Sequence, residues 1–162
     1  MLIRSTTCGV LAMLALTGCE PVGSGPVTPL PPNSPEAHAL MPVGSQWDIL
    51  MLNGRRLDAG VASFGTAGPE AIPNVIGDNS AGFSACNQHT GLAFAPLGLP
   101  KDPDGQISTM AECDDALMAL DEELLAAIPR TEAIGPGSQP GTVDLIAGGQ
   151  RLMVVRRKPD DQ

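Results

Sequence analysis

The sequence predicts an α+β domain in which a small antiparallel sheet packs against one α-helix. Many short apolar segments are separated by turn residues, which is typical of antiparallel strands. Asn53-Gly54, between the first two segments, is the strongest short signal for a hairpin turn. Residues 114–128 stand out because they repeat apolar residues at helical spacing. Several strands with a single helix favour an antiparallel sheet over a parallel, doubly wound one.

The first half of the domain is predicted to consist of short strands. Residues 47–52 (WDILML) form the first, and residues 55–57 begin the return strand after Asn53-Gly54. Further strands are expected at 61–64, 74–77, 82–85, 91–95 and 106–109, with loops at 65–73 and 96–105.

The predicted helix has a start, an apolar face and a stop. Asp114 and Asp115 supply a cap and a negatively charged first turn. An apolar stripe faces the core and consists of Leu117, Leu120, Leu124 and Ile128. Pro129 ends the helix. The acidic side chains of Asp121, Glu122 and Glu123 are expected to form a solvated face.

The C-terminal part returns to strands. A strand is expected at 130–134 and a turn at 135–141, followed by a hairpin of 142–146 and 151–155. The domain is expected to span residues 44–156, and residues 157–162 form a solvated tail.

The N-terminus resembles a bacterial lipoprotein signal, assigned to residues 1–18. Arg4 precedes the apolar run 10–16, and Leu16-Thr17-Gly18-Cys19 has the form of a lipobox. The run is too short to span a bilayer, which needs about 20 apolar residues. A secretory signal cut elsewhere would leave a free thiol at Cys19, so we expect cleavage before this residue and its acylation.

Acylation would anchor the chain in the cell envelope. Two or more acyl chains, such as palmitate, hold a protein stably on a bilayer. Glu20, where Asp often marks retention in the inner membrane, favours the outer membrane facing the periplasm. Residues 19–43 are rich in proline and are expected to form an extended tether, with His38 solvated in it.

Composition excludes some partners. The chain carries 9 Lys+Arg and 18 Asp+Glu, so its formal charge is −9, and loss of Arg4 with the signal makes it −10. This charge argues against nucleic acid and against electrostatic docking on anionic lipid, which leaves Cys19 as the membrane anchor. One Trp, three Phe and no Tyr argue against a surface of stacked rings.

The cysteines suggest a disulfide. Cys8 leaves with the signal and Cys19 is acylated, so Cys86 and Cys113 remain in an oxidising compartment. We favour a bridge between them; two buried free thiols are the alternative.

No catalytic or metal site is evident. Cys86, His89 and Cys113 offer three ligands where structural zinc usually has four. A bridge would remove Cys86 as a nucleophile for His89, which is expected in a turn where Asn87 makes structural hydrogen bonds. Ser84 and Ser108 lack a Gly-x-Ser-x-Gly context. We therefore expect a protein that is not an enzyme and uses no cofactor.

Several landmarks together resemble the META domain, the family of the heat-shock protein HslJ. They are Trp47, Gly82-Phe83-Ser84-Ala85-Cys86-Asn87 with Gly91, Thr109-Met110-Ala111-Glu112-Cys113, the acidic helix and the last strand. Ala85 replaces a usual glycine, Met110 lies one place early, and the usual aromatic after Gly91 is missing.

This resemblance implies a compact β-barrel-like antiparallel sheet with one packed helix. It also implies a role in stress tolerance or envelope maintenance through binding of a protein or a small apolar ligand. One alternative is a pilot lipoprotein for a secretion channel, by analogy of fold. Another is an inhibitor of a cell-wall enzyme that presents residues 96–105 as a blocking loop.

Overall fold

The computed structural model describes residues 25–66, 80–101 and 105–159, and the signal, Cys19 and the strand expected at 74–77 lie outside this range. The described strands are β1 (Gln46–Leu52), β2 (Arg55–Arg56), β3 (Ser63–Thr66), β4 (Ala81–Ser84), β5 (Gln88–Leu92), β6 (Ile107–Ser108), β7 (Ala133–Pro136), β8 (Thr142–Ala147) and β9 (Gln150–Arg157). The α-helices are α1 (Pro35–Leu40) and α2 (Asp115–Ala127), with 3-10 turns at Ala95–Leu97 and Ile128–Arg130.

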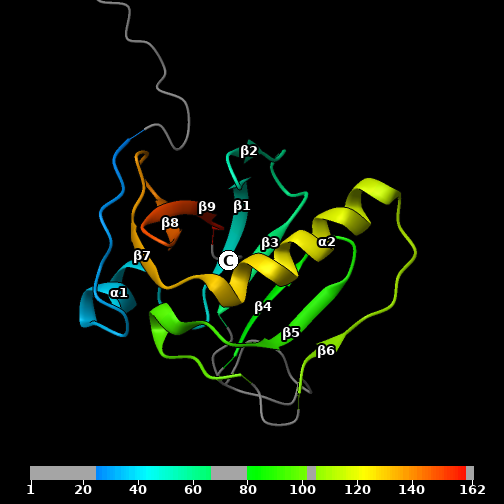
Figure 1. Cartoon of the computed structure of the whole chain (residues 1–162), viewed down its shortest axis with the longest axis horizontal. Helices are drawn as coiled ribbons and strands as arrows, with labels where there is room; N and C mark the ends of the chain where they lie inside the picture. Colours follow the sequence, from blue (N-terminus) through cyan, green and yellow to red (C-terminus); the bar gives the residue numbers. More distant parts are fainter. Residues whose placement is uncertain (1–24, 67–79, 102–104, 160–162) are drawn as a thin grey trace, which may run out of the picture.

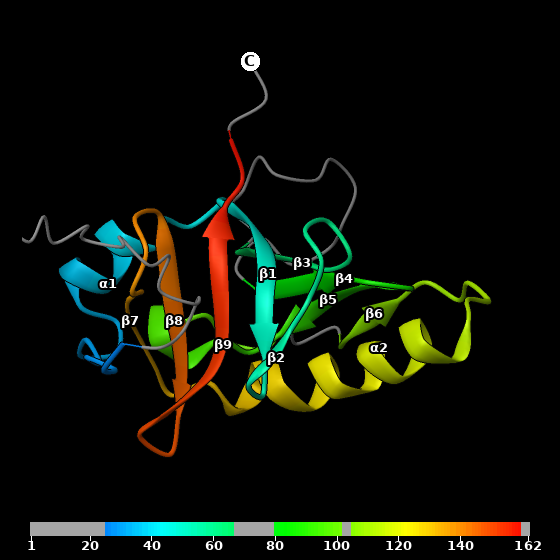
Figure 2. The ribbon, with the colours of Figure 1, turned by 90° about the horizontal axis from the view of Figure 1, so that it is seen from above.

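The strands form one antiparallel sheet in the order β6-β5-β4-β3-β1-β9-β8-β7, with β2 paired to β1. The sheet curves, and the long helix α2 lies along one of its faces (Figures 1 and 2). Within the described residues β6 and β7 are the two edges, so the sheet is open. The prediction of an α+β fold dominated by antiparallel sheet is confirmed, whereas the closed, barrel-like form is not observed.

The hairpin of β1 and β2 is the element that local chemistry determines most completely. Asn53 and Gly54 have φ angles of 49° and 78°, and both are the left-handed conformations that the tight hairpin turn requires. Leu52 pairs with Arg55 across this turn. The hairpin of β8 and β9 is also confirmed, with Ala147 opposite Gln150.

Three strands are displaced from their predicted positions. β3 continues to Thr66, β5 begins at Gln88 and ends at Leu92, and β7 begins only at Ala133. The polar start of β5 is extended because Gln88 and His89 pair with β4, and His89 also pairs with β6. Strand boundaries here follow from pairing with distant segments, which local hydrophobicity does not report.

Helix α2 has the predicted cap and the predicted apolar face. The carboxylate of Asp114 accepts a hydrogen bond from the backbone N–H of Leu117 at 2.9 Å. Leu120, Leu124 and Ile128 are buried in the core. The prediction that Asp121 is solvated is wrong, since it is only 3% exposed. Asp121 follows Leu117 by four residues, so it lies on the same buried face of the helix.

The segment before β1 belongs to the folded domain, which therefore starts earlier than the predicted boundary at residue 44. Ser34 caps α1 and Pro35 occupies its first turn. Ala37 and Met41 are fully buried. Upstream, the backbone N–H of Leu30 donates to the carbonyl of Ile134 on β7. Ala37 and Met41 are apolar and four residues apart, which is the spacing of one helical face, and this was the sequence signal for the packing.

The C-terminal boundary also differs slightly. β9 includes Arg157, and the backbone N–H of Lys158 donates to the carbonyl of Gln46 at 2.8 Å. Arg156 and Lys158 both lie within 4 Å of the Asp48 carboxylate. Arg156, at the predicted end of the domain, and Lys158, in the predicted solvated tail, are therefore both tied to β1.

Candidate functional site

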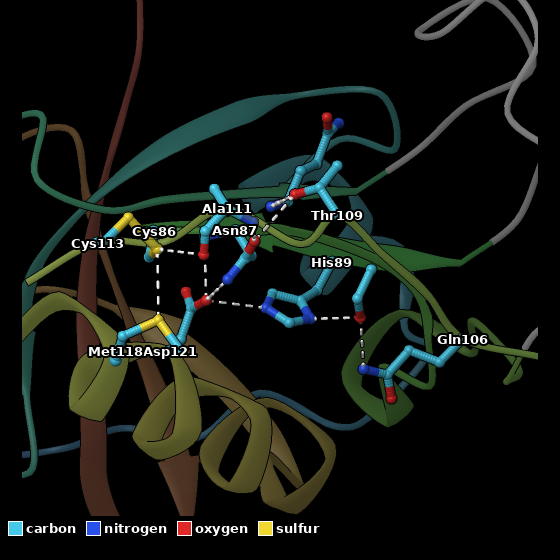
Figure 3. A network of polar contacts seen from close by, with 11 residues as sticks. Cys86, Asn87, His89, Gln106, Thr109, Ala111, Cys113, Met118 and Asp121 are labelled. Atoms are coloured by element: carbon cyan, nitrogen blue, oxygen red, sulfur yellow. Dashed lines mark hydrogen bonds and ion pairs between the residues drawn. A yellow bond between two sulfur atoms is a disulfide. The ribbon is translucent and has the colours of Figure 1, made fainter. Parts of the chain in front are cut away.

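The Cys86–Cys113 bridge is confirmed, with a Cα–Cα distance of 5.9 Å. It joins the loop between β4 and β5 to the residue before the cap of α2. Figure 3 shows the bridge beside a network of polar side chains. The Cys86 sulfur also contacts the Met118 sulfur at 3.6 Å. The disulfide thus fixes the start of α2 against the sheet.

Asn87 makes the structural hydrogen bonds that its position after Cys86 predicts. Its side-chain oxygen accepts from the backbone N–H of Ala111 at 2.7 Å and from the hydroxyl of Thr109 at 3.3 Å. Its backbone N–H and its side-chain amide both donate to Asp121 Oδ2 at 3.0 Å. One buried amide therefore links the β4–β5 loop, the segment before α2, and α2 itself (Figure 3).

His89 does not lie in the predicted turn. It lies in β5, is 5% exposed, and stacks on the Phe83 ring at a centroid distance of 4.5 Å. Its Nε2 is 3.2 Å from Asp121 Oδ2, and its Nδ1 is 2.7 Å from the Ser108 hydroxyl (Figure 3). The imidazole therefore connects α2 with the edge strand β6.

Asp121 is the centre of this network. Its Oδ2 accepts three N–H groups, two from Asn87 and one from His89. A carboxylate oxygen that receives several buried donors forms stronger hydrogen bonds than a neutral acceptor would. Asp121 Oδ1 is buried and has no hydrogen-bond partner among the described residues. The sequence signal for this burial is that Asp121 lies four residues after Leu117, and residues four apart share one face of a helix.

The remaining residues of the META-like pattern have separate structural roles. Gly91 has a φ of 81° at an irregularity in the pairing of β4 and β5, where a residue with a side chain would be strained. Trp47 is 2% exposed in β1, and its indole N–H donates to the Ser45 hydroxyl at 2.7 Å. Neither residue contributes a group to the network around Asp121.

Trp47 instead lines a cavity of about 470 Å³ at the other half of the sheet. The Cα atoms of Trp47 and Arg157 are register partners on β1 and β9, and Leu40 comes from α1. The described lining consists of Leu40, Trp47, Pro136, Gly137, Ser138, Gln139, Pro140, Gly141, Thr142, Val143 and Arg157. The cavity is partly open to solvent.

The sequence also raises metal binding, at Cys86, His89 and Cys113, and a blocking loop at residues 96–105. Among the described residues, no group of three or more His, Cys, Asp and Glu side chains is arranged to hold a metal ion. In the segment expected to form a blocking loop, Pro96, Leu97 and Leu99 are buried, so its first half packs into the domain. In the part of the chain that the structure describes, no helix is long and apolar enough to cross a bilayer.

Comparison with protein-family models, with curated proteins and with solved structures finds no match for this chain. The resemblance to META domains therefore stays a prediction, supported by the order of the landmark residues. The structure defines an open antiparallel sheet, a helix α2 whose start is held to the sheet by a disulfide, a buried polar network around Asp121, and a separate cavity.

Proposed function

We propose that this chain is a lipid-anchored envelope protein whose domain binds a small ligand with an apolar tail and a negatively charged end. The observation that carries the proposal is the cavity between α1, the turn from β7 to β8, and the Trp47–Arg157 pair. Binding of such a ligand would serve envelope maintenance or stress tolerance.

The size and the walls of the cavity favour this class of ligand. Small-molecule sites usually enclose about 300–1,000 Å³ and have mostly apolar walls, and this cavity of about 470 Å³ falls within that range. Leu40, Pro136 and Pro140 provide accessible apolar surface, whereas Trp47 and Val143 also line the cavity but are only 2% and 1% exposed. Of the described residues that line it, Arg157 alone carries a formal charge, and a guanidinium suits a carboxylate or phosphate.

The position of the cavity also agrees with a membrane-derived ligand. Arg151 donates to the backbone carbonyl of Gly25 at 2.9 Å, which fastens the N-terminal segment to β9. Gly25 lies close to Ser138 in the cavity lining. The chain that leads back to Cys19 therefore joins the domain beside the cavity. An acylated Cys19 would hold this side of the domain near the bilayer, where molecules with acyl tails are abundant.

The resemblance to META domains supports the role in stress tolerance or envelope maintenance, which is the role that the resemblance implies. The Cys86–Cys113 bridge supports an oxidising compartment such as the periplasm. Metabolic labelling with palmitate tests the anchor separately: label on the unchanged chain and none on Cys19→Ser is expected. Equal labelling of the two chains would contradict acylation at this residue.

Fluorescence tests the ligand site directly, because Trp47 is the only tryptophan of the chain. The Cys19→Ser chain, which has no acyl group to compete, is titrated with dodecanoate and with dodecyltrimethylammonium. These probes share an apolar tail and differ in the sign of their charge. We expect a saturable change in Trp47 emission with dodecanoate and a weaker affinity for the cation.

Two neighbouring arginines provide matched variants. Arg157→Gln removes the charge in the cavity and should weaken dodecanoate binding about twofold to fivefold, the upper part of the range for one exposed charge pair. Arg156→Gln removes the same charge from a residue outside the cavity lining and should leave the affinity unchanged. Equal affinity for both probes, or equal effects of both substitutions, would contradict the proposed site.

A further inference from the structure

Three side chains outside the cavity form a chain of two hydrogen bonds. Ser108 on β6, His89 on β5 and Asp121 on α2 are joined in that order by contacts of 2.7 Å (Oγ to Nδ1) and 3.2 Å (Nε2 to Oδ2). A hydroxyl bonded to an imidazole, which is oriented in turn by a carboxylate, is the signature of an activated nucleophile. The residues are 19 and 32 positions from His89 along the chain, so only folding brings them together.

The hydrogen-bond pattern sets the direction of proton transfer. Asp121 Oδ2 accepts two N–H groups from Asn87, so it acts as an acceptor toward His89 as well. His89 Nε2 must then carry the hydrogen of that bond. In the neutral imidazole the other nitrogen has a free lone pair. Nδ1 therefore accepts from the Ser108 hydroxyl and is placed to take its proton.

The three hydrogen-bonded side chains differ in their exposure to solvent. Ser108 is exposed on the edge strand, whereas His89 is 5% and Asp121 3% exposed. A substrate can therefore reach the hydroxyl while the base and its orienting carboxylate are shielded from water. The side-chain amide of Gln106, which is itself an exposed residue, lies 3.4 Å from Ser108 Oγ. An amide N–H at that place can donate to an oxyanion that forms next to Oγ.

We propose that Ser108 is a catalytic nucleophile for acyl transfer from small activated esters, with His89 as the general base and Asp121 as a positioning residue. This site shares no residue with the cavity and is independent of the ligand proposed for it.

The reaction balances with water as the second substrate. Ser108 Oγ bonds to the ester carbonyl carbon, and its proton passes to His89 Nδ1. The tetrahedral oxyanion then collapses, the carbon–oxygen bond to the alcohol breaks, and the alcohol leaves with the proton from His89. A water molecule repeats these steps on the acyl-Ser108 ester, which releases the carboxylic acid and restores the hydroxyl.

A fluorophosphonate probe tests the nucleophile on the full chain in detergent micelles with its disulfide intact. Attack by Oγ forms an oxygen–phosphorus bond, breaks the phosphorus–fluorine bond and releases fluoride. Peptide mass mapping should place the adduct on Ser108. Ser108→Ala should abolish it, and Ser84→Ala, on β4, should retain it. No adduct on Ser108 in the unchanged chain would overturn the proposal.

A second variant tests the base without removing the nucleophile. His89→Gln can still donate a hydrogen bond but provides no imidazole, and it should slow labelling at least about 100-fold, the lower range for a general base. Far-UV circular dichroism shows whether this variant is folded. An unchanged labelling rate in folded His89→Gln would overturn the proposal. For Asp121→Asn, positioning predicts a changed pH profile of labelling, whereas a purely structural role alters only the folded fraction.

Discussion

Asp121→Ala is the substitution that tests the polar network most severely. It removes the oxygen that accepts two hydrogen bonds from Asn87 and one from His89. All three donors belong to residues less than a tenth exposed, so they lose their partner away from bulk water. Each buried donor left without a partner costs about 1–3 kcal/mol.

The net effect is smaller than the sum of three such losses. The folded protein no longer has to bury a carboxylate, and alanine is a better helix former than aspartate by roughly 0.5 kcal/mol. Three unpaired donors at about 1–3 kcal/mol each, offset by these two gains, leave an expected loss of about 3–5 kcal/mol in the free energy of unfolding. At an m-value of about 2 kcal/mol per molar urea, the midpoint falls by roughly 2 M.

Urea unfolding followed by Trp47 fluorescence measures this change. Glu122→Ala is the matched control, since this neighbouring acidic residue on α2 is exposed, and it should change stability by less than about 0.5 kcal/mol. A double-mutant cycle with Asn87→Ala should give a combined loss below the sum of the single losses, because the residues share two bonds. A loss below about 1 kcal/mol for Asp121→Ala would refute the reasoning.

Two further substitutions test other parts of the fold. Replacing Cys86 and Cys113 together by serine should lower the free energy of unfolding by about 3–4 kcal/mol, because the bridge closes a loop with a sequence separation of 27 residues and so lowers the entropy of the unfolded chain. Urea unfolding with and without reductant measures this loss. Reductant should destabilise the unchanged chain and should not affect the variant. Met41→Ala should cost about 2–5 kcal/mol, as expected for a fully buried side chain, whereas Val43→Ala, at a site 39% exposed, should cost little. Equal, small effects of these last two changes would mean that the segment of α1 does not pack on the domain.

Local patterns predicted the elements whose conformation depends on neighbours in the sequence. The turn at Asn53-Gly54, the cap at Asp114 and the apolar stripe of α2 are all of this kind, and all are confirmed. The segment of α1 was expected to belong to an extended tether, because residues 19–43 are rich in proline. Its Ser34-Pro35 start and the spacing of Ala37 and Met41 are nevertheless helical signals.

The candidate sites depended on contacts that local patterns do not encode. Asp121 was assigned to a solvated face from its charge, although its helical position faces the sheet. Ser108 and His89 meet only because β5 pairs with β6, and their sequence contexts contain no familiar motif. Arg157 was placed in a tail, yet it continues β9 opposite Trp47. In each case the partner is distant in the chain, and strand register decides the contact.

Amide chemical shifts measured during a dodecanoate titration would locate the ligand most directly. A ligand in the cavity should perturb the backbone amides of Leu40, Gly137 and Val143 most strongly and leave those around Asn87 unchanged. Saturable shifts confined to the Asn87 side of the sheet, or no saturable shifts at all, would contradict the assignment of the cavity as the binding site.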